Sequence, residues 1–340
     1  MIYRSKAPLR IGLAGGGTDV SPYSDEYGGA ILNATVSLSA YASIEQINEN
    51  AIIVEALDRK EEERFEWAPS LPINGHLDLL KGVYNRIHSM YGTPLTGFRL
   101  STFVDAPAGS GLGTSSTLVV AILGAFVEML KLPLGDYDIA HLAYNIERKD
   151  LKLAGGKQDQ YAATFGGVNF MEFYGDDKVI VNPLRVRPEY LHELGNNLVL
   201  YFTATSRESA NIIKEQVKNV TNKDEKSIEA MHQLKEQAKM MKEAVLKGRL
   251  NEIGEILDFG FKQKRMMAHN ISNDKIELIY NAAKKAGATG GKISGAGGGG
   301  FMIFYCPNNT RYKVIETLNT FGGEIKNYSF TKYGLTTWTI

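Results

Sequence analysis

Residues 105–123 read Asp-Ala-Pro-Ala-Gly-Ser-Gly-Leu-Gly-Thr-Ser-Ser-Thr-Leu-Val-Val-Ala-Ile-Leu, and they decide the fold of this chain. An extended stretch at 97–104 precedes them, and an apolar run of helical character over 115–131 follows. The glycines let the backbone turn tightly, and the Thr-Ser-Ser run at 114–116 supplies N-cap candidates for the helix. Unpaired N–H groups and the positive end of the helix dipole converge at such a junction, which makes it a site for an anion. We predict that this loop holds the phosphates of a nucleotide.

The bulk composition is that of a soluble globular protein with balanced charge. The chain has 340 residues, of which 44% are hydrophobic and 22% charged, and its formal net charge is zero. This balance disfavours a dedicated nucleic-acid binder, which is usually basic overall. The length favours two domains. We place an N-terminal domain at 1–190 and a C-terminal domain at 191–340.

Features that report on location favour the cytoplasm. Cys306 is the single cysteine, so no intramolecular disulfide can form, which fits a reducing compartment. Residues 1–8 lack the apolar core and cleavage site of a signal peptide. No apolar run approaches the ~20 residues that a membrane span needs. We expect no membrane partner, and the sequence leaves the oligomeric state open.

Hydrophobic periodicity predicts a mixture of helices and strands without the βαβαβ alternation of a doubly wound nucleotide-binding fold. Strands are expected at 3–14, 30–47, 51–57, 62–67, 97–104, 167–174, 178–186, 198–204, 301–306, 324–330 and 334–340. Helices are expected at 77–91, 115–131, 136–150, 207–219, 224–247, 249–268, 274–286 and 309–321. The segments 155–161 and 187–196 are expected to be irregular, because glycine, proline and asparagine interrupt the pattern there.

Three glycine-rich loops, at 12–17, 109–113 and 295–300, lie far apart in the sequence. The first contains Gly12-x-x-Gly15, which is not the dinucleotide fingerprint, and no Gly-x-x-x-x-Gly-Lys-Ser/Thr motif exists, so a P-loop nucleotidase is excluded at motif level. The third loop could allow close packing between a strand and its neighbour. So many glycines are costly in backbone entropy, however, which favours close backbone approach to a ligand.

The three loops together carry a resemblance to the GHMP small-molecule kinases (galactose, homoserine, mevalonate and phosphomevalonate kinases). Residues 7–19 resemble the first motif of that superfamily, 107–116 the second and 292–300 the third, in the family order. The resemblance implies an α+β fold of two domains. The N-terminal domain would be ribosomal-protein-S5-domain-2-like and the C-terminal domain ferredoxin-like. It also implies ATP and Mg²⁺ as cofactors.

Two further segments, 155–161 and 203–207, look most like the heptose kinase branch. That branch implies transfer of the γ-phosphate of ATP to the anomeric hydroxyl of D-glycero-D-manno-heptose 7-phosphate, giving the 1,7-bisphosphate. Gly16 and Gly17 stand where galactokinases have Glu-His, which opens space and favours a larger sugar phosphate. Two alternatives stay open: another sugar 1-kinase, such as an L-fucokinase-like enzyme, and a non-catalytic sensor of sugar or nucleotide.

The resemblance also implies roles for single residues. Asp159 matches the carboxylate that accepts the proton of the acceptor hydroxyl, and Arg10 the cation that offsets charge on the transferred phosphoryl group. Ser115 matches the hydroxyl that meets Mg²⁺, and Glu147 the carboxylate that completes metal binding. The alternative for Glu147 is a solvated charged face of its helix.

The remaining site residues follow from the same motifs. The implied nucleotide-binding residues are Pro107, Gly109, Ser110, Gly111, Leu112, Gly113, Thr114, Ser115 and Ser116. The implied substrate-binding residues are Asp19, Gly16, Gly17, Lys157, Gly297 and Gly298. Candidate cations for a 7-phosphate, by their nearness to the motifs, are Lys157, Arg207 and Lys292. The six histidines show no short metal-ligand spacing, and no Gly-x-Ser-x-Gly elbow is present, which disfavours a zinc site and a hydrolase.

Overall fold

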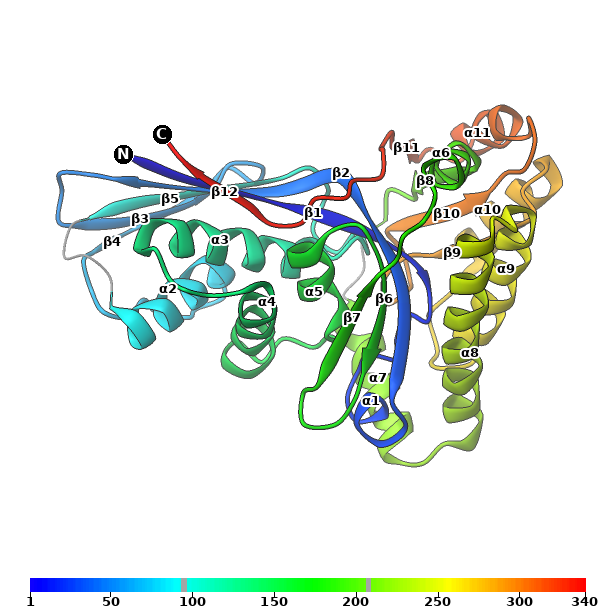
Figure 1. The fold of residues 1–340 in the computed structure, drawn as a ribbon, viewed down its shortest axis with the longest axis horizontal. Coiled ribbons are helices and arrows are strands. Elements are labelled where there is room, and N and C mark those ends of the chain that lie inside the picture. The colour runs from blue at the N-terminus through cyan, green and yellow to red at the C-terminus, as the bar shows by residue number, and fades with distance from the viewer. Residues whose placement is uncertain (93–96, 206–208) are drawn as a thin grey trace.

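Two sheets with helices packed against them make up the structure, a computed structural model that describes residues 1–92, 97–205 and 209–340 (Figure 1). Within these residues the first sheet contains eight strands: β1 (Ile2–Ala14), β2 (Gly29–Gln46), β3 (Ala51–Ala56), β4 (Glu61–Glu66), β5 (Phe98–Val104), β6 (Val168–Phe173), β7 (Val179–Pro183) and β12 (Thr336–Thr339). The second sheet contains β8 (Leu198–Phe202), β9 (Gly290–Ile293), β10 (Phe301–Tyr305) and β11 (Glu324–Ile325).

The long strand β2 organises the first sheet. It pairs with β1 along most of its length, with β6 at its start (29–34) and with β5 at its end (40–46). These pairings are antiparallel, whereas β3 runs parallel to β5. The sheet therefore branches at β2, and the order β12-β1-β2-β5-β3-β4 forms one arm while β6 and β7 form the other.

The helices divide between the two halves of the chain. Those of the first half are α1 (Tyr23–Tyr27), α2 (Asp78–Tyr91), α3 (Thr114–Leu130), α4 (Asp136–Asn145) with a π-helical turn at Ile146–Asp150, and α5 (Gln158–Phe165). Those of the second half are α6 (Pro188–Asn197), α7 (Ser209–Thr221), α8 (Glu225–Lys247), a 3₁₀ turn at Leu250–Glu252, α9 (Ile253–Lys264), α10 (Asp274–Ala286) and α11 (Arg311–Asn319). Figure 1 shows α2 to α5 on one side of the first sheet and α8 beside α9 along the second.

Helix α3 is the centre of the first half because it is apolar on nearly all sides. Its residues from Thr117 to Phe126 are buried, against β1 and β2 on one side and α2 on the other. A helix buried in this way needs no polar face, which explains the continuous Leu-Val-Val-Ala-Ile-Leu run. Because α3 is held by this packing, the glycine loop at its N-terminus is held in place as well.

A second apolar core joins the two halves. It contains Leu9 and Ile11 from β1, Leu200 from β8, Met241 from α8 and Leu257 from α9, all with at most 1% of their surface exposed. Residues far apart in the sequence therefore share one dry interior. This shared core holds the first and third glycine loops close to each other.

The structure differs from the sequence-based expectations in several places. Segment 155–161 was expected to be irregular, but α5 begins within it at Gln158. Segment 187–196 was also expected to be irregular, but helix α6 occupies it, with Pro188 at the first helical position, where its fixed φ is favourable.

The chain end returns to the first sheet, because β12 pairs with β1, and the two termini lie side by side in Figure 1. The division at 190/191 stays a prediction. Among the described residues, no helix has the length and apolar character to cross a membrane.

A pair of phenylalanines on β5 tests the core around α3. Phe98 is fully buried, with its ring centroid 5.8 Å from that of Phe126, whereas Phe103 on the same strand is 42% exposed. We expect Phe98→Ala to lower the free energy of unfolding by about 3–5 kcal/mol, because it leaves a cavity. Phe103→Ala serves as the control and should cost less than about 1 kcal/mol. Urea denaturation followed by tryptophan fluorescence measures both, and equal losses would contradict this account of the core.

Candidate active site

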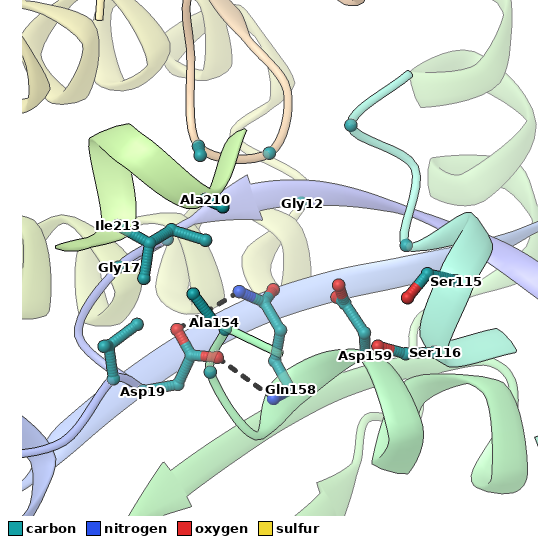
Figure 2. Close-up of a pocket in the computed structure, with 18 of the residues that line it drawn as sticks. Gly12, Gly17, Asp19, Ser115, Ser116, Ala154, Gln158, Asp159, Ala210 and Ile213 are labelled. Carbon is teal, nitrogen blue, oxygen red and sulfur yellow. Dashed lines mark hydrogen bonds between the residues drawn. The ribbon is translucent and has the colours of Figure 1, made fainter. Parts of the chain in front are cut away.

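The three glycine loops meet at one cavity of about 310 Å³, although up to 280 residues separate them in the chain. Figure 2 shows part of its lining, with Asp19, Gln158, Asp159 and Ser115 in a row along one wall. Residues from the sequence-based set that line the cavity are Arg10, Gly16, Gly17, Asp19, Gly109, Gly111, Gly113, Thr114, Ser115, Ser116, Glu147, Asp159 and Lys292. The structure therefore brings together residues of all three motifs.

Other residues from that set do not line the cavity. They are Pro107, Ser110, Leu112, Lys157, Gly297 and Gly298, of which all but the exposed Pro107 are buried. Arg207 lies outside the described residues. The Lys157 amine instead pairs with Asp25 at 3.1 Å and with Asp177 at 3.4 Å, which anchors the start of α5. Its position supports a structural role in place of the predicted contact with substrate.

The second and third loops pack directly against each other. The N–H of Phe301 donates to the carbonyl of Ser110 at 2.8 Å, and the Ser294 hydroxyl donates to the carbonyl of Gly111 at 2.7 Å. A Cβ on Gly295 would lie 2.7 Å from the Cα of Gly111. Close packing between backbones, the alternative considered from sequence, thus explains this glycine.

The remaining glycines of the third loop follow the same rule. A Cβ on Gly297 would lie 2.9 Å from the Cα of Ile271, and one on Gly299 would lie 2.6 Å from the carbonyl oxygen of Thr205. Of this loop, Gly295 and Ala296 line the cavity. The expectation that the glycines of the third loop serve ligand approach is therefore wrong for Gly297 and Gly299, whose neighbours are protein atoms.

The sequence suggested that hydroxyl side chains cap the N-terminus of α3, but among the described residues no side chain caps it. The N-cap residue is Gly113, in the left-handed region with φ of 78°. Ser115 and Ser116 donate instead to the two carboxylate oxygens of Glu147, the second at 2.6 Å. Gln160 donates to the same carboxylate at 2.7 Å. Glu147 is 1% exposed and so belongs to the cavity wall, not to a solvated helix face.

The buried Arg10 and the half-buried Asp159 form an ion pair in the cavity. The Nε of Arg10 donates to Oδ1 of Asp159 at 2.6 Å, and its Nη1 donates to the carbonyl of Gly111 at 2.6 Å. Asp159 lies in the first turn of α5 and also touches the second loop, since a Cβ on Gly113 would be 3.0 Å from its Cγ. The guanidinium is thus fixed between β1, α5 and the glycine loop.

Asp19 lies beside this pair, on the first loop. Its carboxylate accepts hydrogen bonds from the backbone N–H and the side-chain amide of Gln158, at 3.0 and 3.2 Å (Figure 2). Burial raises its pKa above the usual range, an effect that the backbone hydrogen bond opposes. A Cβ on Gly156 would collide with the same carboxylate, so this glycine makes room for Asp19. Gln158 was not singled out from the sequence as a contact of Asp19.

Lys264 is a further cavity residue that sequence reasoning missed. It ends α9, and it is 3% exposed and donates to the carbonyl of Gly295. Burial, and to a lesser extent the charge of Arg10, lower its pKa to about 8. No motif surrounds Lys264 in the sequence, and helix ends commonly carry lysine, so only the fold reveals it.

The residues around Glu147 fit a magnesium ion shared with phosphate. Among the described residues, no group of three or more His, Cys, Asp or Glu side chains could hold a metal. Mg²⁺ does not need such a group, because it binds through one or two protein oxygens, substrate phosphates and water. Glu147 and the Ser115 hydroxyl offer two such oxygens at the N-terminus of α3.

Comparison with known proteins agrees with this geometry. Residues 78–167 match the family described as GHMP kinases N terminal domain, and residues 241–324 match GHMP kinases C terminal. The chain is 46% identical over 337 residues to D-glycero-alpha-D-manno-heptose 7-phosphate kinase of Campylobacter jejuni, covering 99% of both chains. A crystal structure of a D-glycero-D-manno-heptose 1-phosphate kinase from Bacteroides thetaiotaomicron has a TM-score of 0.85 and 46% identity, over 99% of both chains.

More distant relatives show the extent of the similarity. L-fucokinase/L-fucose-1-P guanylyltransferase of Bacteroides fragilis is 26% identical over 87% of this chain, which spans 34% of that protein. A mevalonate kinase structure at 22% identity and a TM-score of 0.74 shares the fold.

The cavity and the fold define a phosphotransferase that acts on a small molecule. The chain belongs to the GHMP kinase family, and the α+β fold predicted from its three motifs is confirmed.

The contact between the second and third loops can be tested with two glycines. Gly295 and Gly322 both have φ near +70°, but a Cβ on Gly322 would have no neighbour within 4 Å. Alanine at either position costs roughly 1–2 kcal/mol of backbone strain. Gly295→Ala should cost about 1–3 kcal/mol more, because the loops must move apart. Thermal and urea unfolding measure the difference, and equal losses would show that the loop contact is not tight.

Proposed function

We propose that this protein transfers the γ-phosphate of ATP to the anomeric hydroxyl of D-glycero-D-manno-heptose 7-phosphate, giving the 1,7-bisphosphate. The observation that carries the proposal is the Arg10–Asp159 pair beside Asp19, in one cavity with the glycine loops. The 46% identity to a heptose 7-phosphate kinase over nearly the whole chain supports the choice of sugar.

In this proposal Asp159 accepts the proton of the attacking hydroxyl. Its carboxylate is 20% exposed and faces the cavity, so a hydroxyl can reach it. Arg10 holds one carboxylate oxygen and so fixes the orientation of the group. The guanidinium offsets negative charge that develops on the transferred phosphoryl oxygens. Positioning the reactants in line supplies a large part of the rate enhancement.

The glycine loop at the start of α3 holds the phosphates of the nucleotide. Backbone N–H groups at the helix N-terminus are free for this role, because no side chain caps them. Ser115 and Glu147 hold Mg²⁺, which neutralises charge on the phosphate oxygens when it is bound. Gln160 and Ser116 keep the Glu147 carboxylate turned toward the cavity.

Asp19 binds hydroxyl groups of the sugar. Its two oxygens are held by Gln158, and further acceptor positions remain for sugar hydroxyls. The side-chain oxygen of Gln158 has no hydrogen-bond partner within the described chain although it is buried, so it is available to a sugar hydroxyl. Gly16 lines the same part of the cavity and leaves room for a large sugar, whereas the Met267 side chain already fills the space beside Gly17, which was expected to open space as well.

Two other functions are less well supported. An L-fucokinase-like activity is weakened by the lower identity, 26%, to the curated fucokinases. A non-catalytic sensor would not need a carboxylate held by a buried guanidinium next to a metal-binding carboxylate. The absence of turnover with every sugar tested would favour the sensor.

A substrate panel tests the proposed reaction. With ATP and Mg²⁺, we expect turnover of heptose 7-phosphate to exceed that of fucose, galactose and mannose, because those sugars lack a phosphate. A coupled assay for ADP measures each rate, and phosphorus NMR of the product places the new phosphate at C1. Strong activity on an unphosphorylated sugar alone would contradict the assignment of heptose phosphate.

Removing the charge of Asp159 tests its role as the base. We expect Asp159→Asn to lower kcat by about 10²–10⁴-fold, because the amide cannot accept the hydroxyl proton. Nucleotide affinity, measured by calorimetry, should change little. Asp136→Asn, at an exposed position at the start of α4, is the matched control and should behave as wild type. An Asp159→Asn enzyme with wild-type turnover would refute the assignment.

A further inference from the structure

Among the described residues, no carboxylate forms an ion pair with either of two buried lysines in the cavity. Lys264 and Lys292 are 3% and 5% exposed, and both line the cavity. The Lys264 amine donates to the carbonyl of Gly295, and the Lys292 amine donates to the carbonyl of Gly12 at 2.9 Å. Across residues 1–92, 97–205 and 209–340, neither amine forms an ion pair. Each ammonium has three donors, so donors remain unused on both.

The two amines lie together around Gly16. A Cβ placed on Gly16 would lie 3.8 Å from the Nζ of Lys264 and 3.9 Å from the Nζ of Lys292. The backbone of Gly16 has no positive φ, and no other atom lies closer to this Cβ position, so neither strain nor protein packing explains the glycine there. The bare Cα leaves the amines open to a ligand in the cavity.

Uncompensated buried ammonium groups destabilise a protein unless an anion joins them. Burial, with the charges of Arg10 and of the neighbouring lysine, lowers the pKa of Lys292 well below the usual range, and burial lowers that of Lys264 to about 8. The lowered pKa values favour the neutral amines while no anion lies between them. A doubly negative ligand placed between the amines would favour their charged form and raise both pKa values.

We propose that Lys264 and Lys292 bind the phosphate that the sugar substrate already carries, and so make the enzyme select phosphorylated over unphosphorylated sugar. This inference rests on the proposed function. Two neighbours place the amines on the sugar side of the cavity. The charge of Asp19 acts on Lys264. A Cβ placed on Gly12 would lie 3.9 Å from the side-chain oxygen of Gln158 and 3.9 Å from the Lys292 amine. Within the described chain, neither amine forms a hydrogen bond or ion pair with Ser115 or Glu147, the residues proposed to hold Mg²⁺ beside the nucleotide.

Gly16 and its neighbour Gly17 differ in a way that supports this placement. A Cβ on Gly17 would lie 2.6 Å from the terminal methyl of Met267, so protein atoms already fill that space. A Cβ on Gly16 would have only the two amines within 4 Å among the described residues beyond its chain neighbours. A sugar with a phosphorylated tail, held by Asp19 at its ring, can extend across Gly16 to reach them.

Lys264→Met and Lys292→Met test the site, because methionine keeps much of the apolar stem without the charge. A charge-assisted hydrogen bond lost at each position predicts a rise in KM for heptose 7-phosphate of about 10- to 100-fold. The kcat/KM for D-glycero-D-manno-heptose, which lacks the phosphate, should change less than about 3-fold. Lys262→Met, on the same helix with a side chain 65% exposed, is the control and should match wild type on both sugars.

Gly16→Ala gives a second test that leaves the lysines in place. The methyl group fits without steric collision or backbone strain but stands between the amines and the cavity. It should raise KM for heptose 7-phosphate and leave the melting temperature within about 2 °C of wild type. This variant keeps the inference testable if a lysine variant fails to fold.

The possible results separate three explanations. A raised KM for the phosphorylated sugar alone supports the inference. Equal losses on both sugars with a raised KM for ATP would overturn it, because the amines would then serve the nucleotide phosphate. Unchanged kinetics would also overturn it.

Failure of the proposed function has a separate signature, in which wild-type enzyme neither binds nor phosphorylates heptose 7-phosphate. Calorimetry with inorganic phosphate then tests the amines directly. Binding to wild type and to Lys262→Met, but not to Lys264→Met, would support the anion site, and equal binding to all three would refute it.

Discussion

The contact between the second and third glycine loops is the constraint on which the site depends. Backbone atoms of Ser110 and Gly111 touch the backbone of Ser294, Gly295 and Phe301, and the Gly111 carbonyl also accepts a hydrogen bond from the Ser294 hydroxyl. One loop belongs to the first half of the fold and the other to the second. Their contact therefore fixes the helix N-terminus that is proposed to bind phosphate relative to the residues that follow β9. A residue larger than glycine at position 111 or 295 would separate the two parts of the cavity.

Charge within the cavity is arranged in two unequal regions. On one side Arg10 is neutralised by Asp159, and Glu147 is held by hydroxyl and amide donors. On the other side Lys264 and Lys292 have only carbonyl partners in the described chain. The first region is complete without a ligand, and only the second requires an anion. An enzyme that binds two phosphorylated substrates at once needs such a division. The phosphate of one substrate must be kept apart from the phosphoryl group that is transferred from the other.

The sequence allowed prediction of the parts of the site that are local in the chain. Three glycine-rich motifs in a fixed order were enough for the fold class, and the Arg10, Glu147 and Asp159 side chains do meet in one cavity. Helix α5 was missed because it is short and only Lys157 separates its start from two glycines. Lys264 was missed because its neighbours in space come from distant loops, and a lysine at a helix end has an ordinary explanation. Hydrophobic periodicity indicates which face of a helix or strand is buried, but it does not indicate which loops come together in space.

The glycines show how a structure can separate two causes of the same residue choice. Gly295 and Gly17 have left-handed backbones, and a Cβ on either would collide with protein atoms, so the fold itself requires them. Gly12 and Gly16 have ordinary backbones, and a Cβ on either would have neighbours no closer than 3.8 Å, all of them polar side-chain ends. Folding alone would permit alanine at these two positions. Their glycines are therefore explained by what enters the cavity, and the atoms that face them, two amines and an amide oxygen, are those suited to bind a phosphorylated sugar.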